Sequence, residues 1–156
     1  RFLDSRKIPY TAFDTLPEKL GALETAHYLD LEPDSVFKTI VVVRAKPKKP
    51  LLVMVPGTAS VDLKLLAAAL GEKKVHLPTE REAEQLTGLQ AGGISPLALI
   101  NRGFQVMLDA SARKREEIHV SGGQRGLNIR LAVADLVRLT NARVAAVCRP
   151  ADESSI

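Results

Sequence analysis

Residues 36–43 have the sequence Val36-Phe37-Lys38-Thr39-Ile40-Val41-Val42-Val43, and a second apolar run follows at Leu51-Leu52-Val53-Met54-Val55. Both runs are rich in β-branched and apolar residues, which favour extended strands. The polar stretch between them, Lys46-Pro47-Lys48-Lys49-Pro50, is typical of the connection in a hairpin. The sequence therefore predicts two consecutive strands, the first of them covered on both faces.

Further helices and strands are predicted on both sides of this hairpin. Possible capping boxes start helices at Thr15 with Glu18 and at Thr79 with Glu82, and Gly88 closes the second. Two more helices are expected at residues 61–70, ended by Gly71, and at 134–140. The other expected strands are residues 10–13, 74–77, 104–109, 118–120, 127–131 and 143–147. Irregularly interspersed helices and strands indicate a mixed α/β or α+β domain.

Length and composition indicate one cytoplasmic domain. The chain has 156 residues, of which 46% are hydrophobic and 26% charged, so residues 1–156 are expected to form a single domain. Cys148 is the only cysteine, which excludes an internal disulfide and fits a reducing compartment. The longest apolar runs are about five to eight residues, well below the roughly 20 that span a bilayer. No signal-peptide pattern opens the sequence.

The charge balance is mildly basic, at a formal +4. Such an excess attracts a polyanion without specifying which one. The chain has no Trp, two Tyr and four Phe, which argues against binding single strands by stacked aromatic rings. If RNA is the partner, phosphate contacts and a pocket must recognise it. The cluster Arg113-Lys114-Arg115-Glu116-Glu117 is either a solvated face or a contact for such phosphates.

Lys38 is the most informative single residue. Strand alternation places it on the same face as Val36, Ile40 and Val42. A lysine on an apolar face is costly unless its ammonium reaches a partner, a cavity or water. Two interpretations stay open: a lysine near a sheet edge whose stem extends outward, or a functional group in a cavity.

Two glycine-rich loops are the other notable features, namely Gly92-Gly93-Ile94-Ser95-Pro96 and Ser121-Gly122-Gly123-Gln124-Arg125-Gly126-Leu127-Asn128. Glycine permits positive φ and lets backbone N–H groups approach a ligand. Neither loop has the pattern of a P-loop or a dinucleotide fingerprint. Each alone is commonly a tight turn, but two such loops together with Lys38 favour a pocket.

Other polar residues give weaker signals. No metal-ligand spacing connects the scattered residues His27, His76, His119 and Cys148, so no metal site is expected. Cys148, beside an apolar run, is interpreted as a small core residue. Ser95 or Ser121 could act as a nucleophile only with a base in reach, and no motif supplies one.

Three motifs in order resemble the YbaK/EbsC family of aminoacyl-tRNA editing deacylases, which is similar to the editing domain inserted in bacterial prolyl-tRNA synthetases. They are Val36-Phe37-Lys38-Thr39, Gly92-Gly93-Ile94-Ser95-Pro96-Leu97 and Ser121-Gly122-Gly123-Gln124-Arg125-Gly126-Leu127. Val61-Asp62-Leu63-Lys64 and residues 69–75 support the resemblance, which extends from about Phe2 to Cys148. It implies a compact domain with a mixed, partly barrel-like sheet around a pocket.

The resemblance also implies an activity and its partners. The activity is hydrolysis of the ester of mischarged aminoacyl-tRNA, in trans and without metal or cofactor. Cys-tRNA(Pro)/Cys-tRNA is the leading substrate, and tRNA charged with Ala, Ser or Thr is the alternative. The expected partner is the 3′ end of aminoacyl-tRNA, with prolyl-tRNA synthetase as a second candidate, and neither DNA nor a membrane is expected.

Site residues follow from the same resemblance. Lys38 matches the functional lysine of the family, and the N–H groups of Gly92, Gly93 and Gly122 are expected to hold the developing oxyanion. The substrate-binding positions are expected to be Ile94, Ser95, Pro96, Ser121, Gly122, Asn128 and Thr15. Two of these depart from close relatives, which carry an aspartate at Asn128 and an aromatic residue at Thr15.

Two other functions are compatible with the sequence. A binding module of the same fold would hold a tRNA end or a synthetase without hydrolysis, although Lys38 and both glycine loops argue against it. An unrelated small-molecule esterase would need a nucleophile and base pair that the sequence does not offer.

Overall fold

The two apolar runs form adjacent antiparallel strands, β2 (Phe37–Val42) and β3 (Leu51–Pro56), as predicted. The computed structural model describes residues 2–16, 18, 20–45, 48–100 and 102–151, so Lys46 and Pro47 of the predicted connection lie outside the described residues. On its other side β3 pairs in parallel with β5 (Gln105–Asp109), which pairs in parallel with β8 (Arg143–Ala145). The first sheet is therefore mixed, with the order β2-β3-β5-β8.

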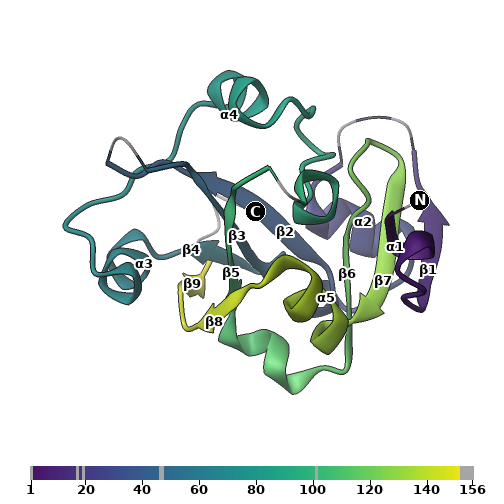
Figure 1. The fold of residues 1–156 in the computed structure, drawn as a ribbon. Coiled ribbons are helices and arrows are strands. Elements are labelled where there is room, and N and C mark those ends of the chain that lie inside the picture. Colours follow the sequence, from purple (N-terminus) through teal and green to yellow (C-terminus); the bar gives the residue numbers. More distant parts are fainter. Residues whose placement is uncertain (1, 17, 19, 46–47, 101, 152–156) are drawn as a thin grey trace.

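A second, antiparallel sheet stands beside the first (Figure 1). It has the order β1-β7-β6, from β1 (Tyr10–Asp14), β7 (Leu127–Ala132) and β6 (Glu117–Ser121). A parallel bridge between Val36 and His119 links the two sheets. Two short strands, β4 (Ala59–Val61) and β9 (Cys148–Pro150), form a separate pair. The architecture is the predicted mixed α/β type, and the described strands do not close a barrel.

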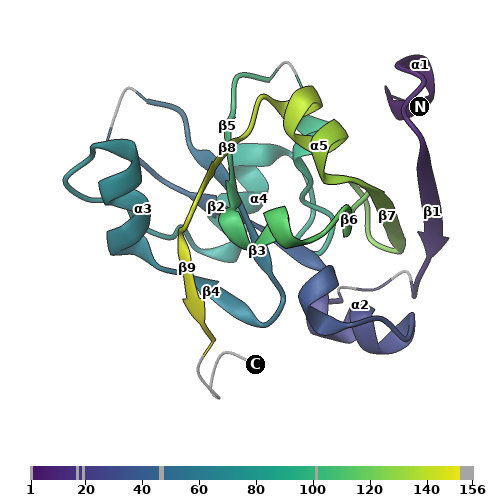
Figure 2. The same ribbon diagram turned by 90° about the horizontal axis from the view of Figure 1, so that it is seen from below.

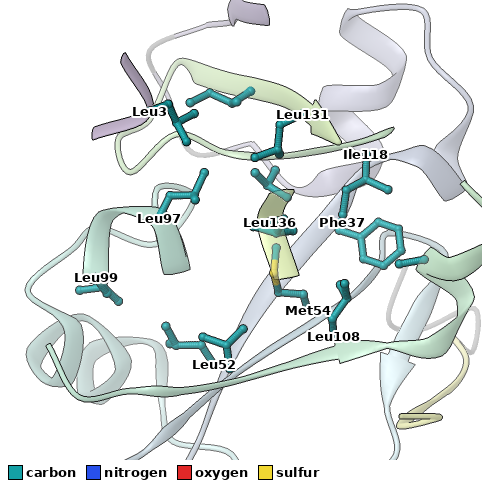
Figure 3. Close-up of a cluster of buried hydrophobic side chains, with 14 of the residues drawn as sticks. Leu3, Phe37, Leu52, Met54, Leu97, Leu99, Leu108, Ile118, Leu131 and Leu136 are labelled. Atoms are coloured by element: carbon teal, nitrogen blue, oxygen red, sulfur yellow. The ribbon is translucent and has the colours of Figure 1, made fainter. Parts of the chain in front are cut away.

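The apolar core lies on both faces of β3, whose six residues are all buried. One cluster fills the space between the two sheets and includes Leu52 and Met54 of β3 together with Leu136 of helix α5 (Val133–Thr140) (Figure 3). The other cluster packs helix α3 (Leu63–Leu70) against the opposite face. Burial of one such leucine contributes about 1.5–3 kcal/mol, and these two clusters determine how the sheets are arranged.

Helix termini follow the predicted signals in two of the four places. Helix α3 is capped by Asp62, and Gly71 ends it with a φ of 69°. Helix α4 (Glu80–Thr87) has the predicted capping box: the Glu82 N–H donates to Thr79 Oγ1 at 3.1 Å, and the Thr79 N–H donates to Glu82 Oε1 at 3.0 Å. Gly88 ends α4 with a φ of 73°.

Two sequence predictions are wrong. Helix α2 (Ala22–Tyr28) begins after Gly21, whose N–H donates to Glu24 Oε1 at 3.1 Å, so Thr15 and Glu18 cap no helix. Residues 74–77 form no strand, because pairing there is limited to the isolated bridge between His76 and Val43. Both regions have a local pattern that the surrounding tertiary contacts override.

Several short elements had no prediction. They are α1 (Phe2–Ser5), the strands β4 and β9, and the 3-10 helices η1 (Pro33–Ser35), η2 (Pro96–Leu99) and η3 (Ala110–Lys114). Figure 2 shows β4 and β9 side by side, beside helix α3. Helices within the described ranges are all too short or too polar to cross a membrane.

Asp109 ties the end of β5 to the segment between β8 and β9. Its buried carboxylate accepts the Val147 N–H at 2.9 Å through Oδ1 and the Ser111 N–H at 3.0 Å through Oδ2. Burial raises the pKa of this carboxyl, but the hydrogen bonds from Ser111, Val147 and Cys148 outweigh it and leave the pKa below its ordinary value.

Asp109→Ala should lower the free energy of unfolding by about 2–4 kcal/mol, because two N–H groups lose their acceptor and one of them is fully buried. Urea unfolding at pH 7 measures the loss. Glu117→Ala, which removes the exposed ion pair with Arg130, is the control and should cost no more than about 1 kcal/mol. A loss below 1 kcal/mol for Asp109→Ala would contradict this structural role.

Candidate functional site

A cavity of about 280 Å³ lies where the two sheets meet. Its walls come from β2, the first glycine loop, the facing ends of β6 and β7, and the segment that enters α2. Six of the residues that the sequence singled out line it: Thr15, Lys38, Gly92, Ile94, Ser121 and Asn128. The lining does not include Gly93, Ser95, Pro96 or Gly122.

Lys38 projects from β2 and is partly buried. It lies opposite Val55 in the sheet and shares its face with Ile40 and Val42, as the alternation predicted. Burial lowers the pKa of the Lys38 ammonium, and a charge interaction with Cys148 opposes this to a smaller extent. Since no described residue accepts a hydrogen bond from it, the ammonium is available to a ligand.

The two glycine loops, far apart in sequence, pack against each other to form one wall. Arg125 Nε donates to the Ala91 carbonyl at 2.7 Å. A Cβ on Gly93 would lie 2.9 Å from Gln124 Cα, so only glycine allows the two backbones to approach this closely. The Gly93 N–H donates to the Gln90 carbonyl at 2.8 Å. Gly93 therefore builds the wall, and its N–H is not available to an oxyanion.

The other two glycines differ in whether their N–H groups already donate a hydrogen bond within the chain. Gly122 N–H donates to the Leu127 carbonyl at 2.9 Å. Gly92 has a φ of 89° and lines the cavity, and its N–H has no acceptor among the described residues. The N–H of Ile94 likewise has no acceptor among the described residues. The sequence indicated only that the Ile94 side chain would line the pocket.

Ser95 and Pro96 fix the exit of the first loop. Ser95 is fully buried, and its Oγ accepts the Leu97 N–H at 3.2 Å at the start of η2. Pro96 is the first residue of η2, a position that suits its fixed φ. These two residues hold Ile94 and Gly92 in place without lining the cavity.

Ser121 and Thr15 lie on opposite sides of the second loop. Ser121 Oγ lies 3.5 Å from the Gly92 carbonyl, the outer limit of a hydrogen bond, and 3.4 Å from the Gly123 nitrogen. The Thr15 N–H donates to the Gly126 carbonyl at 2.8 Å. Among the residues that the structure describes, no base contacts the Ser121 hydroxyl, which is therefore interpreted as a polar wall group and not as an activated nucleophile.

Asn128 is held by a residue that the sequence did not single out, His119. Asn128 Oδ1 lies 2.8 Å from His119 Nδ1, and both residues are buried. Burial lowers the pKa of His119, although the hydrogen bond with Asn128 partly opposes this. A neutral His119 that donates from Nδ1 leaves the Asn128 amide N–H₂ to face a ligand. A lone histidine in a strand carries no signal of this role, because the contact spans two strands.

Other reactive groups lie away from this cavity. Burial and the Asp109 carboxylate raise the pKa of the Cys148 thiol to about 12, so it stays protonated and is a poor nucleophile. Cys148 is half-buried at the margin of the second core cluster, close to its expected role as a core residue. Across the described ranges, no three His, Cys, Asp or Glu residues lie close enough together to hold a metal ion.

Comparisons with known proteins agree with this geometry. Residues 17–139 match the model of the aminoacyl-tRNA editing domain. The chain is 34% identical over 149 residues to EbsC of Enterococcus faecalis, a candidate Cys-tRNA(Pro)/Cys-tRNA(Cys) deacylase, covering 94% of this chain and 90% of that protein. It is 30% identical to the proline–tRNA ligase of Aquifex aeolicus over 71 residues, which are 46% of this chain and 12% of the ligase.

Solved structures show the same fold. A hypothetical protein superposes with a TM-score of 0.85 at 23% identity, covering 95% of this chain and 97% of the other. A candidate trans-editing enzyme for prolyl-tRNA synthetase superposes with a TM-score of 0.76 at 24% identity, covering 94% and 92%. The matched family model spans both glycine loops and Lys38, and the resemblance to EbsC is confirmed. The chain belongs to the aminoacyl-tRNA editing domain family.

Proposed function

We propose that this protein hydrolyses the ester bond of mischarged aminoacyl-tRNA in trans, with cysteinyl-tRNA, including Cys-tRNA(Pro), as its leading substrate. One observation carries the proposal. Lys38 and Gly92 line one small cavity, and neither the Lys38 ammonium nor the Gly92 N–H has a hydrogen-bond partner within the described part of the chain. Such donors suit an ester whose carbonyl oxygen becomes negative in the transition state.

The chemistry needs little more than positioning and charge stabilisation, because an aminoacyl ester is intrinsically labile. The Gly92 N–H would hold the carbonyl oxygen as negative charge develops on it, and the Ile94 N–H is available as a second donor. Lys38 would bind the same oxygen or a phosphate of the terminal nucleotide. Water would attack the carbonyl carbon and release the ribose hydroxyl. In a cysteinyl ester, the substrate's own thiol is the alternative attacking group.

The cavity volume favours a small amino acid. About 280 Å³ accommodates a cysteinyl, alanyl, seryl or threonyl group with part of the ribose. A pocket of this kind separates substrates that differ by one methylene by only about 1–3 kcal/mol. Cysteine leads because EbsC, at 34% identity, is named for Cys-tRNA; alanine, serine and threonine are the alternatives.

Because the pocket alone would separate similar amino acids only weakly, we expect a partner protein to add to the selection of the charged tRNA. Prolyl-tRNA synthetase is the candidate, since two proline–tRNA ligases contain segments similar to this chain. Such an enzyme would act in the cytoplasm, where aminoacyl-tRNA is made, and would require no metal or cofactor for the steps described.

The deciding experiment incubates the protein with tRNAs charged with Cys, Ala, Ser, Thr or Pro and follows loss of the ester. Faster loss of at least one ester than in buffer supports hydrolysis, and Cys is expected to be the fastest. Binding of charged tRNA with no acceleration for any amino acid would instead favour the non-catalytic module.

Lys38→Met should lower kcat/KM for the preferred charged tRNA by about 100-fold or more, the usual cost of losing one donor to an oxyanion. Steady-state hydrolysis measures the loss. Near-wild-type turnover by a folded Lys38→Met variant would exclude the proposed role of the ammonium.

The same substitution should leave the melting temperature at pH 7 equal to or above that of the wild type. The pKa of Lys38 is lower in the folded chain than in the unfolded chain, so the folded state carries a penalty while the lysine is protonated. Between the folded and unfolded pKa values the unfolded state binds more protons, and stability rises with pH. The wild type should show this alkaline gain, and Lys38→Met should lack it.

Asn128→Asp should change the ranking of substrates. A carboxylate at this position would still accept a hydrogen bond from His119 but would present an acceptor to the cavity in place of the amide N–H₂. It would attract the α-ammonium of the amino acid. The panel of charged tRNAs tests this, and rates that all move by less than about twofold with an unchanged ranking would show that Asn128 is a structural strand residue.

A further inference from the structure

A second cavity, of about 500 Å³, adjoins the first at Lys38, which lines both. Its other walls come from β4, the start of α3 and β9. The polar side chains that line it are Lys38, Ser60, Asp62, Lys64 and Arg149. Residues 61–64 were noted in the sequence only as support for the family resemblance, and Arg149 was not singled out at all.

The formal charge of this second cavity is positive. Its one carboxylate, on Asp62, also caps the helix: Oδ1 accepts the N–H of Lys64 at 3.1 Å and that of Leu65 at 3.0 Å. Lys38, Lys64 and Arg149 have no anionic partner among the residues described. Ser60, paired with Arg149 across β4 and β9, has a hydroxyl that likewise lacks a partner there. Three cations and one carboxylate therefore line this space together with a hydroxyl, and the cations are in excess by two charges.

We propose that this second cavity binds the phosphate groups at the 3′ end of the tRNA, on the basis of the deacylase function proposed above. An ester held in the first cavity is joined through its ribose to a phosphodiester. The two cavities meet at Lys38 and Ile40, which line both, and Lys38 is the charged member of this pair beside which the phosphodiester would pass. Arg149 adds a planar guanidinium suited to bidentate phosphate binding, and Lys64 adds a second mobile cation.

The apolar residues that line the second cavity fit a nucleotide better than an acidic peptide. Ile40, Val61, Leu63 and the exposed Leu77 give apolar surface beside the cations, which suits a ribose or base next to its phosphate. Arg149 also lines a third cavity, together with Lys114, Arg115 and the acidic Asp34. Basic groups are therefore also present beyond the second cavity, where a strand that begins at the ester could continue.

The test measures binding of uncharged tRNA by fluorescence anisotropy, so it does not depend on hydrolysis. The double variant Lys64→Ala/Arg149→Ala should bind at least about tenfold more weakly than the wild type. The slope of log K against log salt should decrease in magnitude by about 1.4, since each phosphate contact to a single strand contributes about 0.7. Unchanged affinity and slope would overturn the proposal.

A matched control separates a local site from general charge. Arg81→Ala/Arg143→Ala removes the same two positive charges from exposed positions that line none of the three cavities. Its affinity should stay within about twofold of the wild type. An equal loss in both double variants would show only a net-charge effect and would overturn the site. Melting temperatures establish that each variant is folded, and the single variants Lys64→Ala and Arg149→Ala replace the double variant if it is not.

A shortened tRNA locates the contact on the RNA. Removal of the three 3′-terminal nucleotides should weaken binding by the wild type by about tenfold but by less than twofold in Lys64→Ala/Arg149→Ala, because the same contacts are already lost. Equal losses in the two proteins would place the contact elsewhere and overturn the proposal. Competition by polyglutamate but not by a CCA-ended oligonucleotide would assign the cavity to an acidic peptide instead. If the tRNA results hold while no charged tRNA is hydrolysed, the deacylase function fails and the phosphate site stands.

Discussion

The structure depends on the burial of β3 on both faces. Alternate residues of this strand enter different cores: Leu52 and Met54 pack toward the second sheet, whereas Val53 and Val55 pack toward α3. Any strand paired with β3 must divide its side chains in the same way, since paired residues share a face. This constraint fixes β2 in register and places Lys38 beside Val55. A lysine in this position must reach an opening, and both cavities that it lines provide one.

The glycine loops show that a glycine can be required by the packing around a cavity without lining the cavity itself. Gly93 and Gly122 are needed because a Cβ would clash, at 2.9 Å with Gln124 Cα and at 2.5 Å with Leu127 Cγ. Gly92 is different, since it lines the cavity and its N–H has no acceptor among the described residues. The sequence pattern is the same for all three. Whether a glycine N–H is hydrogen-bonded depends on a partner in the folded chain, so only the structure separates the two packing glycines from the one whose N–H has no acceptor among the described residues.

The sequence predicted features that are determined by residues close together in the chain better than features that depend on contacts between distant segments. The capping box of Thr79 and Glu82 lies within one turn and was predicted correctly. The strand predicted at 74–77 was wrong because His76 finds a single bridge with Val43 instead of a full partner strand. The pairing of His119 with Asn128 and the contact of Arg125 with Ala91 arise between segments that pack together only on folding. Motif order predicted the family and the main wall of the site, but not the residues that position it.

The division between the two cavities has a consequence for specificity. Amino acids that differ by a single methylene are separated by a cavity such as the first by only about 1–3 kcal/mol. Binding energy from the proposed phosphate contacts of the second cavity would be the same for every charged tRNA, since such contacts involve neither the amino acid nor the base sequence. That energy would raise affinity without improving discrimination. Under the proposed function, selection of the mischarged tRNA would therefore come from the walls of the first cavity, where Asn128 and Thr15 lie, or from a synthetase that delivers one kind of tRNA.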